Sequence, residues 1–275
     1  MRVALTGASG LVGRFVHRGL SAAGHEVVTL GRGGGADRPF SLGETGPDLN
    51  GVDALVHLAL SHLPGRYRGG EGDDPEGFRE LNRGGTERLF AAARMAGVGR
   101  IVFLSSRAVY GVQPEGMPLI ETTPCRPDTE YGRVKLAGEA AARDSGVIST
   151  ALRATGVYGP APDGAHKWAD LFADLRAGRE IAPRVGTEVH GDDLAAAVAL
   201  VLDHPAPPAI LNVSDIMLDR RDLLRIASDA MGLGAPLPER ADATRVNEMD
   251  TRALRALGWM PGGWDALRDA VTRMV

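Results

Sequence analysis

Short apolar runs alternate along this chain with longer amphipathic stretches, a pattern typical of strands and helices that follow one another in turn. Each apolar run is mainly hydrophobic and is bounded by glycine or polar residues, which predicts buried strands over 2–6, 25–30, 52–59 and 100–106. Repeated strand–helix units favour a parallel sheet with helices on both faces. The sequence therefore predicts an α/β fold with a Rossmann-type, doubly wound parallel sheet.

A glycine-rich segment joins the first predicted strand to a stretch with helical spacing. Its first glycine permits a tight turn, the second lets the backbone approach a pyrophosphate, and the third allows close helix–strand packing. The helix start supplies unpaired N–H groups and a positive dipole end, which suit an anion. Because the segment follows a strand and opens a helix, it predicts dinucleotide binding rather than an ordinary loop. The expected contacts come from Gly7, Ser9, Gly10, Leu11, Val12 and Gly13.

The second predicted strand ends in the glycine-rich segment 31–35, which contains Arg32. An NAD site usually offers a carboxylate at this distance from the glycines, for the ribose 2′-hydroxyl, but here no carboxylate precedes Asp37. A guanidinium can pair with a 2′-phosphate that a carboxylate would repel. We therefore predict NADP as the preferred cofactor, with Arg32 as the main contact and Arg14 as a second. The alternative is that Arg32 is a solvated loop charge and that the cofactor is NAD.

Two parts of unequal size are expected. Residues 1–160 are predicted to form the NAD(P)-binding Rossmann domain, with a later segment, about 180–213, returning to its sheet. Residues 161–275 are predicted to form a small α/β substrate-binding lobe. Helical spacing in the carboxy-terminal part indicates helices at 167–177, 192–203 and 220–231.

Composition and charge exclude several classes of function. A net charge of −4 gives no reason to expect nucleic acid as a partner. No apolar run reaches the ~20 residues of a membrane span, and the first strand leaves no room for a signal peptide. The single cysteine, Cys125, fits a reducing compartment, so we expect a cytoplasmic protein. His190, just before two aspartates, is explained by helix capping, and no metal is predicted.

Tyr131 and Lys135 stand one helical turn apart, and Ser106 ends a predicted strand 25 residues before Tyr131. A tyrosine is normally too weak an acid near neutrality, with a pKa of about 10, but a nearby ammonium and an oxidised nicotinamide favour its phenolate. Tyr131 would then exchange a proton with a substrate oxygen that Ser106 holds. A tyrosine and a lysine at this spacing are often only a surface pair on a helix. Because this pair occurs together with the glycine-rich segment, we favour a catalytic role. The predicted reaction is hydride transfer at a secondary alcohol or ketone.

These motifs resemble those of extended short-chain dehydrogenase/reductases, in the NAD(P)-dependent epimerase/dehydratase family. The pattern is met in family order at 6–13, 82–86, 105–111, 131–135, 152–160, 189–194 and 257–261. The resemblance implies a catalytic set of Ser106, Tyr131 and Lys135, the last two also reaching the cofactor. It further implies a homodimer through the predicted helices at 75–96 and 131–143. Further cofactor contacts are expected at Leu58, Ala59, Asn82, Thr155, Gly156 and Val157. The resemblance also implies that Asn82 helps to order the site.

Departures from the family pattern narrow the reaction. Sugar dehydratases of the group carry an acidic pair directly after the serine position, whereas Arg107 and Ala108 stand here, which argues against dehydration. Many nucleotide-sugar epimerases use an asparagine near the position of Gly156 to meet the diphosphate, and glycine has no side chain to do so. We expect a sugar-like or other small polar metabolite as the substrate. Its contacts are predicted at Ser106, Arg107, His62 and Tyr158.

The segment 61–74 is longer than a structural connection needs and carries His62, Arg66, Tyr67 and Arg68. These side chains could meet an anionic substrate or a cofactor phosphate, or the segment could be a solvated loop. Three functions stay open. An NAD(P)-dependent oxidoreductase is favoured over a nucleotide-sugar epimerase with tightly held NAD. A non-catalytic NAD(P)-binding sensor is disfavoured because the Ser-Tyr-Lys set is intact.

Overall fold

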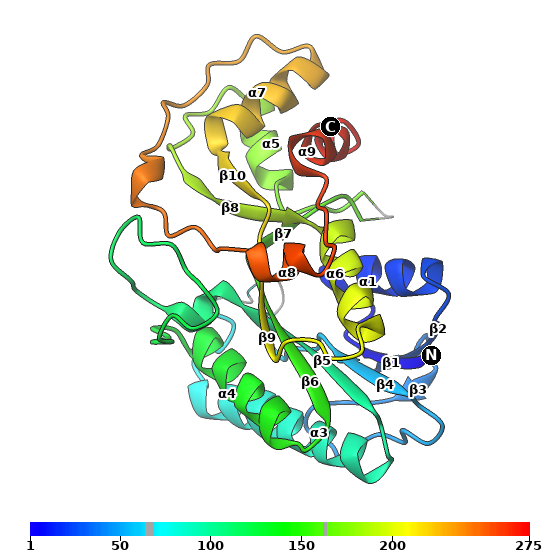
Figure 1. Ribbon diagram of the computed structural model, residues 1–275. Coiled ribbons are helices and arrows are strands. Elements are labelled where there is room, and N and C mark those ends of the chain that lie inside the picture. The colour runs from blue at the N-terminus through cyan, green and yellow to red at the C-terminus, as the bar shows by residue number, and fades with distance from the viewer. Residues whose placement is uncertain (64–65, 67–68, 162–163) are drawn as a thin grey trace.

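The computed structural model describes residues 1–63, 66, 69–161 and 164–275, and its larger part is a seven-stranded parallel sheet (Figure 1). The strand order is β3-β2-β1-β4-β5-β6-β9, and all neighbouring strands in it are parallel. This confirms the predicted doubly wound, Rossmann-type sheet. The strands are β1 (Arg2–Thr6), β2 (Glu26–Gly31), β3 (Arg38–Pro39), β4 (Ala54–His57), β5 (Arg100–Ser106), β6 (Ile148–Ala154) and β9 (Ile210–Val213).

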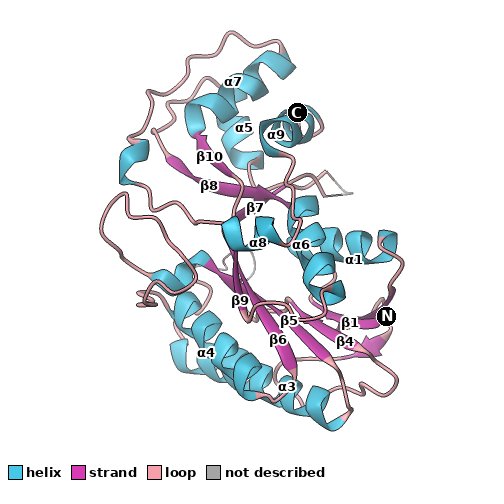
Figure 2. Cartoon of the chain, in the orientation of Figure 1, coloured by secondary structure: helices cyan, strands magenta, loops and turns pink. Residues whose placement is uncertain are grey.

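Helices cover both faces of this sheet (Figure 2). Helices α1 (Leu11–Ala22) and α6 (Gly191–Asp203) pack on one face, and α3 (Gly85–Met95) and α4 (Glu130–Asp144) pack on the other. Along β1, Val3 and Leu5 enter the core beneath α1 and α6, while Ala4 enters the core on the opposite face. Because both faces are buried, the strands read in the sequence as continuous apolar runs.

The smaller part is an α/β lobe built on a three-stranded sheet (Figure 1). In this sheet β8 pairs in parallel with β7 and antiparallel with β10. Its own apolar core is separate from those of the large sheet. The lobe consists of β7 (Gly156–Tyr158), α5 (Ala169–Arg176), β8 (Val185–His190), β10 (Ile216–Asp219), α7 (Arg220–Met231) and α9 (Gly263–Thr272). Short helices lie at Arg107–Tyr110, Ala243–Arg245 and α8 (Arg252–Ala256).

The chain passes between the two parts at Thr155. The Thr155 backbone N–H donates to Val213 O of the large sheet (3.0 Å), and its hydroxyl donates to Thr187 O of the small sheet (2.6 Å). Within the segment about 180–213, α6 and β9 return to the large sheet, whereas β8 pairs with β7 in the lobe. The chain therefore crosses between the two parts more than once after Thr155.

The helix expected over 75–96 is interrupted. It consists of α2 (Pro75–Arg79), a π-helical turn (Glu80–Gly84) and α3. The Asn82 side chain accepts from the Ser61 N–H (2.7 Å) and donates to the Ser61 and Phe78 carbonyls (2.9 and 2.8 Å). Turns of this kind gather at functional sites, and apolar spacing alone does not reveal one extra residue per turn. None of the described helices is both long and apolar enough to span a bilayer.

Candidate active site

A cleft of about 1230 Å³ runs between the large sheet and the lobe. Its floor is the edge where β1, β2, β4, β5 and β6 end, which is where open parallel sheets bind ligands. The lobe closes the other side with β7, β8 and the segment around Val246. Segments far apart in the sequence therefore meet along this one edge.

The glycine segment forms a cradle at one end of the cleft. A Cβ at Gly13 would lie 2.0 Å from the Gly7 carbonyl oxygen, so only glycine lets α1 pack this closely. Gly7 has a φ of +73°, and a Cβ there would lie 2.9 Å from the Ala59 N. These two positions require glycine for conformation and space, independently of any ligand.

The start of α1 fits an anion. Gly10 caps the helix with extended backbone and no side-chain hydrogen bond, and the first turn holds no acidic residue. The first N–H groups of the helix therefore face the cleft together with its positive dipole end. A dinucleotide pyrophosphate fits this arrangement. All six residues predicted to make these contacts line the cleft: Gly7, Ser9, Gly10, Leu11, Val12 and Gly13.

Arg32 lines the cleft at the end of β2, whereas Arg14 does not line it. The one carboxylate of this loop, Asp37, accepts from the Thr29 N–H and hydroxyl (2.8 and 2.7 Å). These two bonds hold the pKa of Asp37 below its usual range. Asp37 does not line the cleft, so the charged side chain that lines it just after β2 is the guanidinium of Arg32.

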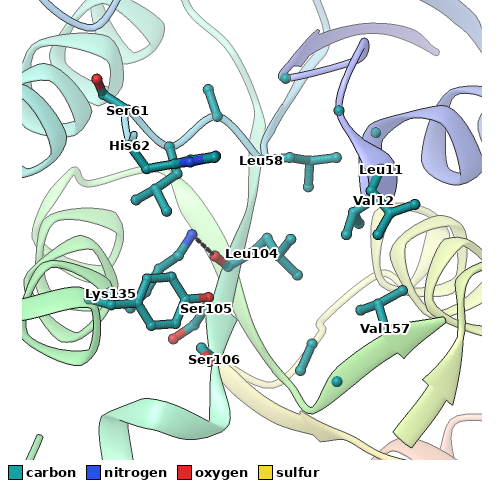
Figure 3. Close-up of a pocket in the computed structure, with 18 of the residues that line it drawn as sticks. Leu11, Val12, Leu58, Ser61, His62, Leu104, Ser105, Ser106, Lys135 and Val157 are labelled. Atoms are coloured by element: carbon teal, nitrogen blue, oxygen red, sulfur yellow. Dashed lines mark hydrogen bonds between the residues drawn. The ribbon is translucent and has the colours of Figure 1, made fainter. Parts of the chain in front are cut away.

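Ser106, Tyr131 and Lys135 all line the same cleft as the glycine cradle. Figure 3 shows Lys135 and Ser106 facing Leu11 and Val12 across it. The Lys135 Nζ donates to the Leu104 carbonyl oxygen (2.7 Å) and lies 5.9 Å from the centre of the Tyr131 ring. Burial lowers the pKa of Lys135 to about 8. The ammonium is therefore held at a fixed place beside the phenol.

A buried ion pair lies beneath this set and was not identified from the sequence. Arg153 holds Glu139 with two bonds of 2.9 and 2.7 Å, and Ser105 also donates its hydroxyl proton to Glu139. Both charged residues are about 5% exposed. Glu139 stands one helical turn beyond Lys135, and its negative charge favours the ammonium form of that lysine. That spacing is the signal that could have indicated it.

A directed chain of hydrogen bonds joins the glycine cradle to Asn82. The Thr6 hydroxyl oxygen accepts from the Leu58 and Ala59 N–H groups (3.1 and 3.2 Å), so its own proton is available to His57 Nδ1 (2.7 Å). His57 Nε2 then donates to the Thr86 hydroxyl (3.0 Å), which donates to the Asn82 carbonyl oxygen (2.6 Å). The bonding pattern thus assigns the neutral Nε2–H tautomer to His57.

Stability is expected to fall on acidification because of His57. Burial, with the nearby Lys135 charge, lowers the pKa of His57 from 6.5 to about 3. Between about pH 3 and pH 6.5, His57 is therefore protonated in the unfolded chain but neutral in the folded chain. Relative to His57→Gln, the wild type should lose about 1.4 kcal/mol of unfolding free energy per pH unit in this window. Urea unfolding at pH 7, 6 and 5 measures it; parallel pH dependences in the two proteins would contradict it.

Besides Arg14, the predicted site residues Asn82 and Tyr158 do not line the cleft. The Asn82 side chain is buried and ties down the backbone of Ser61, which does line it. Tyr158 is fully buried and stacks on Trp168, with ring centres 5.2 Å apart. Successive side chains of a strand point to opposite faces, and Val157 is the one that faces the cleft (Figure 3). The expectation that Tyr158 contacts the substrate is therefore wrong.

The remaining predicted positions lie along the cleft: Leu58, Ala59, His62, Arg107, Thr155, Gly156 and Val157. Arg107 donates to the Asn247 carbonyl oxygen (3.0 Å), which ties it to the far wall. Arg66 is exposed and does not line the cleft, and Tyr67 and Arg68 lie outside the described residues. The sequence also did not indicate the lobe residues that reach the cleft: Lys167, Arg184, Glu188, Arg245 and Asn247.

Among the described residues, no three His, Cys, Asp or Glu side chains gather as metal ligands. The His190 side chain accepts from the Asp192 N–H (3.2 Å) at the start of α6. His190 thus acts as a helix cap in the structure.

This chain is similar to known proteins along nearly its whole length. The sequence profile described as the NAD dependent epimerase/dehydratase family matches residues 3–214. A UDP-glucose 4-epimerase of Streptomyces lividans is 36% identical over 163 residues, which is 53% of this chain and 49% of that relative, so the chain aligns with about half of its length. A dTDP-6-deoxy-L-talose 4-dehydrogenase (NAD(P)(+)) of Kitasatospora kifunensis is 28% identical over 309 aligned positions, covering 99% of this chain and 94% of the relative.

Solved structures are similar to this chain over nearly the whole fold. MoeE5 in complex with UDP-glucuronic acid and NAD superimposes with a TM-score of 0.79 and 26% identity. The match covers 99% of this chain and 97% of MoeE5. The large sheet and the lobe are therefore arranged as in that protein.

Proposed function

Because the chain belongs to the NAD-dependent epimerase/dehydratase family of extended short-chain dehydrogenase/reductases, and is thereby an NAD(P)-dependent enzyme, we propose that it oxidises a secondary alcohol or reduces a ketone. The observation that carries the proposal is that Ser106, Tyr131 and Lys135 line one cleft with the glycine cradle. The proposed substrate is a sugar-like or other small polar metabolite. The decisive test is the replacement of Tyr131, argued in the Discussion.

The proposed mechanism assigns one task to each residue. The nicotinamide, when bound, supplies the hydride acceptor or donor. Tyr131 exchanges the proton with the substrate oxygen, and the adjacent Lys135 ammonium favours the phenolate that this needs. Ser106 holds the same oxygen by hydrogen bonding. The Leu104 carbonyl fixes the Lys135 head group, so the charge does not have to be brought into place during the reaction.

The cofactor preference that we propose is for NADP. Arg32→Ala should raise the Kd for NADPH about 10-fold or more, because a charge-assisted hydrogen bond contributes about 1.5–3 kcal/mol. The Kd for NADH should change less than about twofold, and fluorescence titration of both cofactors measures this. Arg18→Ala is the matched control, since Arg18 pairs with Asp192 (2.6 Å) and does not line the cleft. Tighter binding of NADH than of NADPH by the wild type would overturn the preference.

A second candidate function is a nucleotide-sugar epimerase that keeps NAD bound through turnover. The similarity to a UDP-glucose 4-epimerase and to a protein solved with UDP-glucuronic acid and NAD favours it. Denaturing the purified protein and identifying the released dinucleotide separates the two functions. Retained NAD or NADH supports the epimerase, whereas an empty protein that binds NADPH supports the exchanging oxidoreductase. The homodimer and the cytoplasmic location stay predictions.

A further inference from the structure

Lys135 is a buried ammonium whose direct contacts are uncharged. The residue is 4% exposed, and its Nζ donates to the Leu104 carbonyl oxygen (Figure 3), 5.0 Å from the centre of the Phe103 ring. Among the residues that the structure describes, no carboxylate forms an ion pair with it. Burial disfavours a charge that only neutral groups contact. The ammonium form of Lys135 therefore depends on a negative charge close by.

Two successive residues of β5 bind Lys135 and Glu139 on the neighbouring helix. Leu104 accepts from Lys135 through its carbonyl oxygen, and Ser105 donates its hydroxyl proton to Glu139. The two side chains of α4 are four residues apart, so they share one face of the helix. The Glu139 carboxylate is thus fixed one helical turn from Lys135, against the same strand.

Arg153 fixes the orientation of this carboxylate. Its guanidinium donates two bonds to Glu139 (2.9 and 2.7 Å) and a further bond to the Glu121 carbonyl oxygen (2.9 Å). Paired bonds from one guanidinium set both the place and the angle of a carboxylate. Glu139 cannot turn away from Lys135 without breaking these two bonds and the bond from Ser105.

The other titratable side chains near Lys135 and Glu139 are uncharged near neutral pH. Burial lowers the pKa of His57 to about 3, and it raises the pKa of the Tyr110 hydroxyl and of the Cys125 thiol. Burial also lowers the pKa of Lys135 to about 8, and the charge of Glu139 opposes this fall. Charged groups further out have partners of their own: Glu121 accepts from the Asn212 N–H, and Glu130 pairs with Arg79 and Arg133.

The buried cluster of Lys135, Glu139 and Arg153 has one positive charge in excess, which a phenolate on Tyr131 would balance. Without Glu139, the cluster would hold two cations and no anion. A guanidinium does not give up its proton in a protein, so Lys135 would be the group to lose one. The positive charge beside Tyr131 therefore depends on Glu139.

We propose that Glu139 is a positioning residue that keeps Lys135 an ammonium at its fixed place beside Tyr131. Arg153 and Ser105 act one step further away, by holding Glu139. Glu139 does not line the cleft, so it acts on the proton transfer only through Lys135. This inference rests on the proposed function, because it takes the Lys135 ammonium to support the Tyr131 phenolate.

The test observes the lysine directly, because Lys135 and Lys167 are the only lysines of the chain. The full-length protein labelled with 13C-lysine gives NMR signals from these two side chains alone, and Lys167→Arg assigns them. The Lys135 signals should titrate with a midpoint of about 8 in the wild type. In Glu139→Gln the midpoint should be at least about one pH unit lower, the usual effect of losing a nearby opposite charge.

Three further variants separate the charge of Glu139 from its packing. Asp144→Asn is the matched control, since it removes a carboxylate that is 69% exposed on the same helix, and it should move the midpoint less than about 0.2 pH unit. Arg153→Met keeps Glu139 and should not lower the midpoint. Glu139→Gln combined with Arg153→Met should still titrate below the wild type. An equal fall in Glu139→Gln and in Arg153→Met would overturn the proposal, because disturbed packing would then explain both.

A Lys135 midpoint that stays at the wild-type value in Glu139→Gln would also overturn the inference and leave the proposed function standing. Turnover of Glu139→Gln should fall at a lower pH than that of the wild type, in step with the midpoint. A lower midpoint with an unchanged pH profile of turnover would show that Glu139 does not act on the reaction. The titration needs no substrate, so loss of the proposed function, seen as unchanged turnover in Tyr131→Phe, is a separate result.

Discussion

Replacing Tyr131 by phenylalanine is expected to lower turnover by about 10²–10⁴-fold, the usual contribution of a positioned general acid or base. The change removes only the phenolic oxygen, so the aromatic ring stays beside Lys135. NADPH binding should stay within about twofold of the wild-type value, because the cradle and Arg32 are untouched. The measurement is NADPH oxidation with a carbonyl substrate found by screening, together with a separate cofactor titration.

Tyr158→Phe is the matched control for this experiment. It makes the same chemical change at a fully buried tyrosine that does not line the cleft and whose oxygen has no hydrogen-bond partner among the described residues. Turnover should therefore be unaffected. Unchanged turnover in Tyr131→Phe would remove the proposed mechanism and favour another proton donor.

Replacing Arg153 by methionine is expected to lower the free energy of unfolding by about 3–5 kcal/mol, the usual consequence of leaving a buried charge unpaired. Glu139 would lose both of its bonds to the guanidinium and would stay about 95% buried. Urea unfolding at pH 7 measures this loss.

Two further variants make this prediction specific. Adding Glu139→Gln to Arg153→Met should recover part of the lost stability, since the buried charge is then gone. Arg143→Met, which removes an exposed arginine paired with Asp144 on α4, should cost less than about 0.5 kcal/mol. A loss at Arg153 no larger than at Arg143 would mean that the buried pair contributes little to the fold.

Local sequence signals were sufficient for the cradle and for the tyrosine–lysine pair. The glycine spacing encodes a turn and a helix start within a few residues, and a separation of four residues encodes a shared helix face. Alternating apolar runs likewise predict the parallel sheet, because both of its faces are buried. Each of these patterns depends on neighbours in the chain and not on which distant segment packs against them.

The direction of a side chain was harder to predict from the sequence where it depends on distant segments of the chain. Tyr158 lies in a motif of the family, but the register of β7 turns its side chain into the core of the lobe. Asn82 lies in a π-helical turn that apolar spacing does not reveal. Its side chain holds the backbone of Ser61, which lines the cleft. In both cases the local motif is present, and the direction of the side chain is set by packing.

The sequence by itself thus determined the fold class, the cradle and the three residues of the proposed catalytic set. Only the tertiary structure decided that Glu139 meets Arg153 near Lys135, and that Lys167 pairs with Glu188 beside Gly156. The physical reason is that a buried charge is tolerated only where folding supplies its partner. That partner lies on another strand or helix, so the sequence pattern of either segment alone does not predict it.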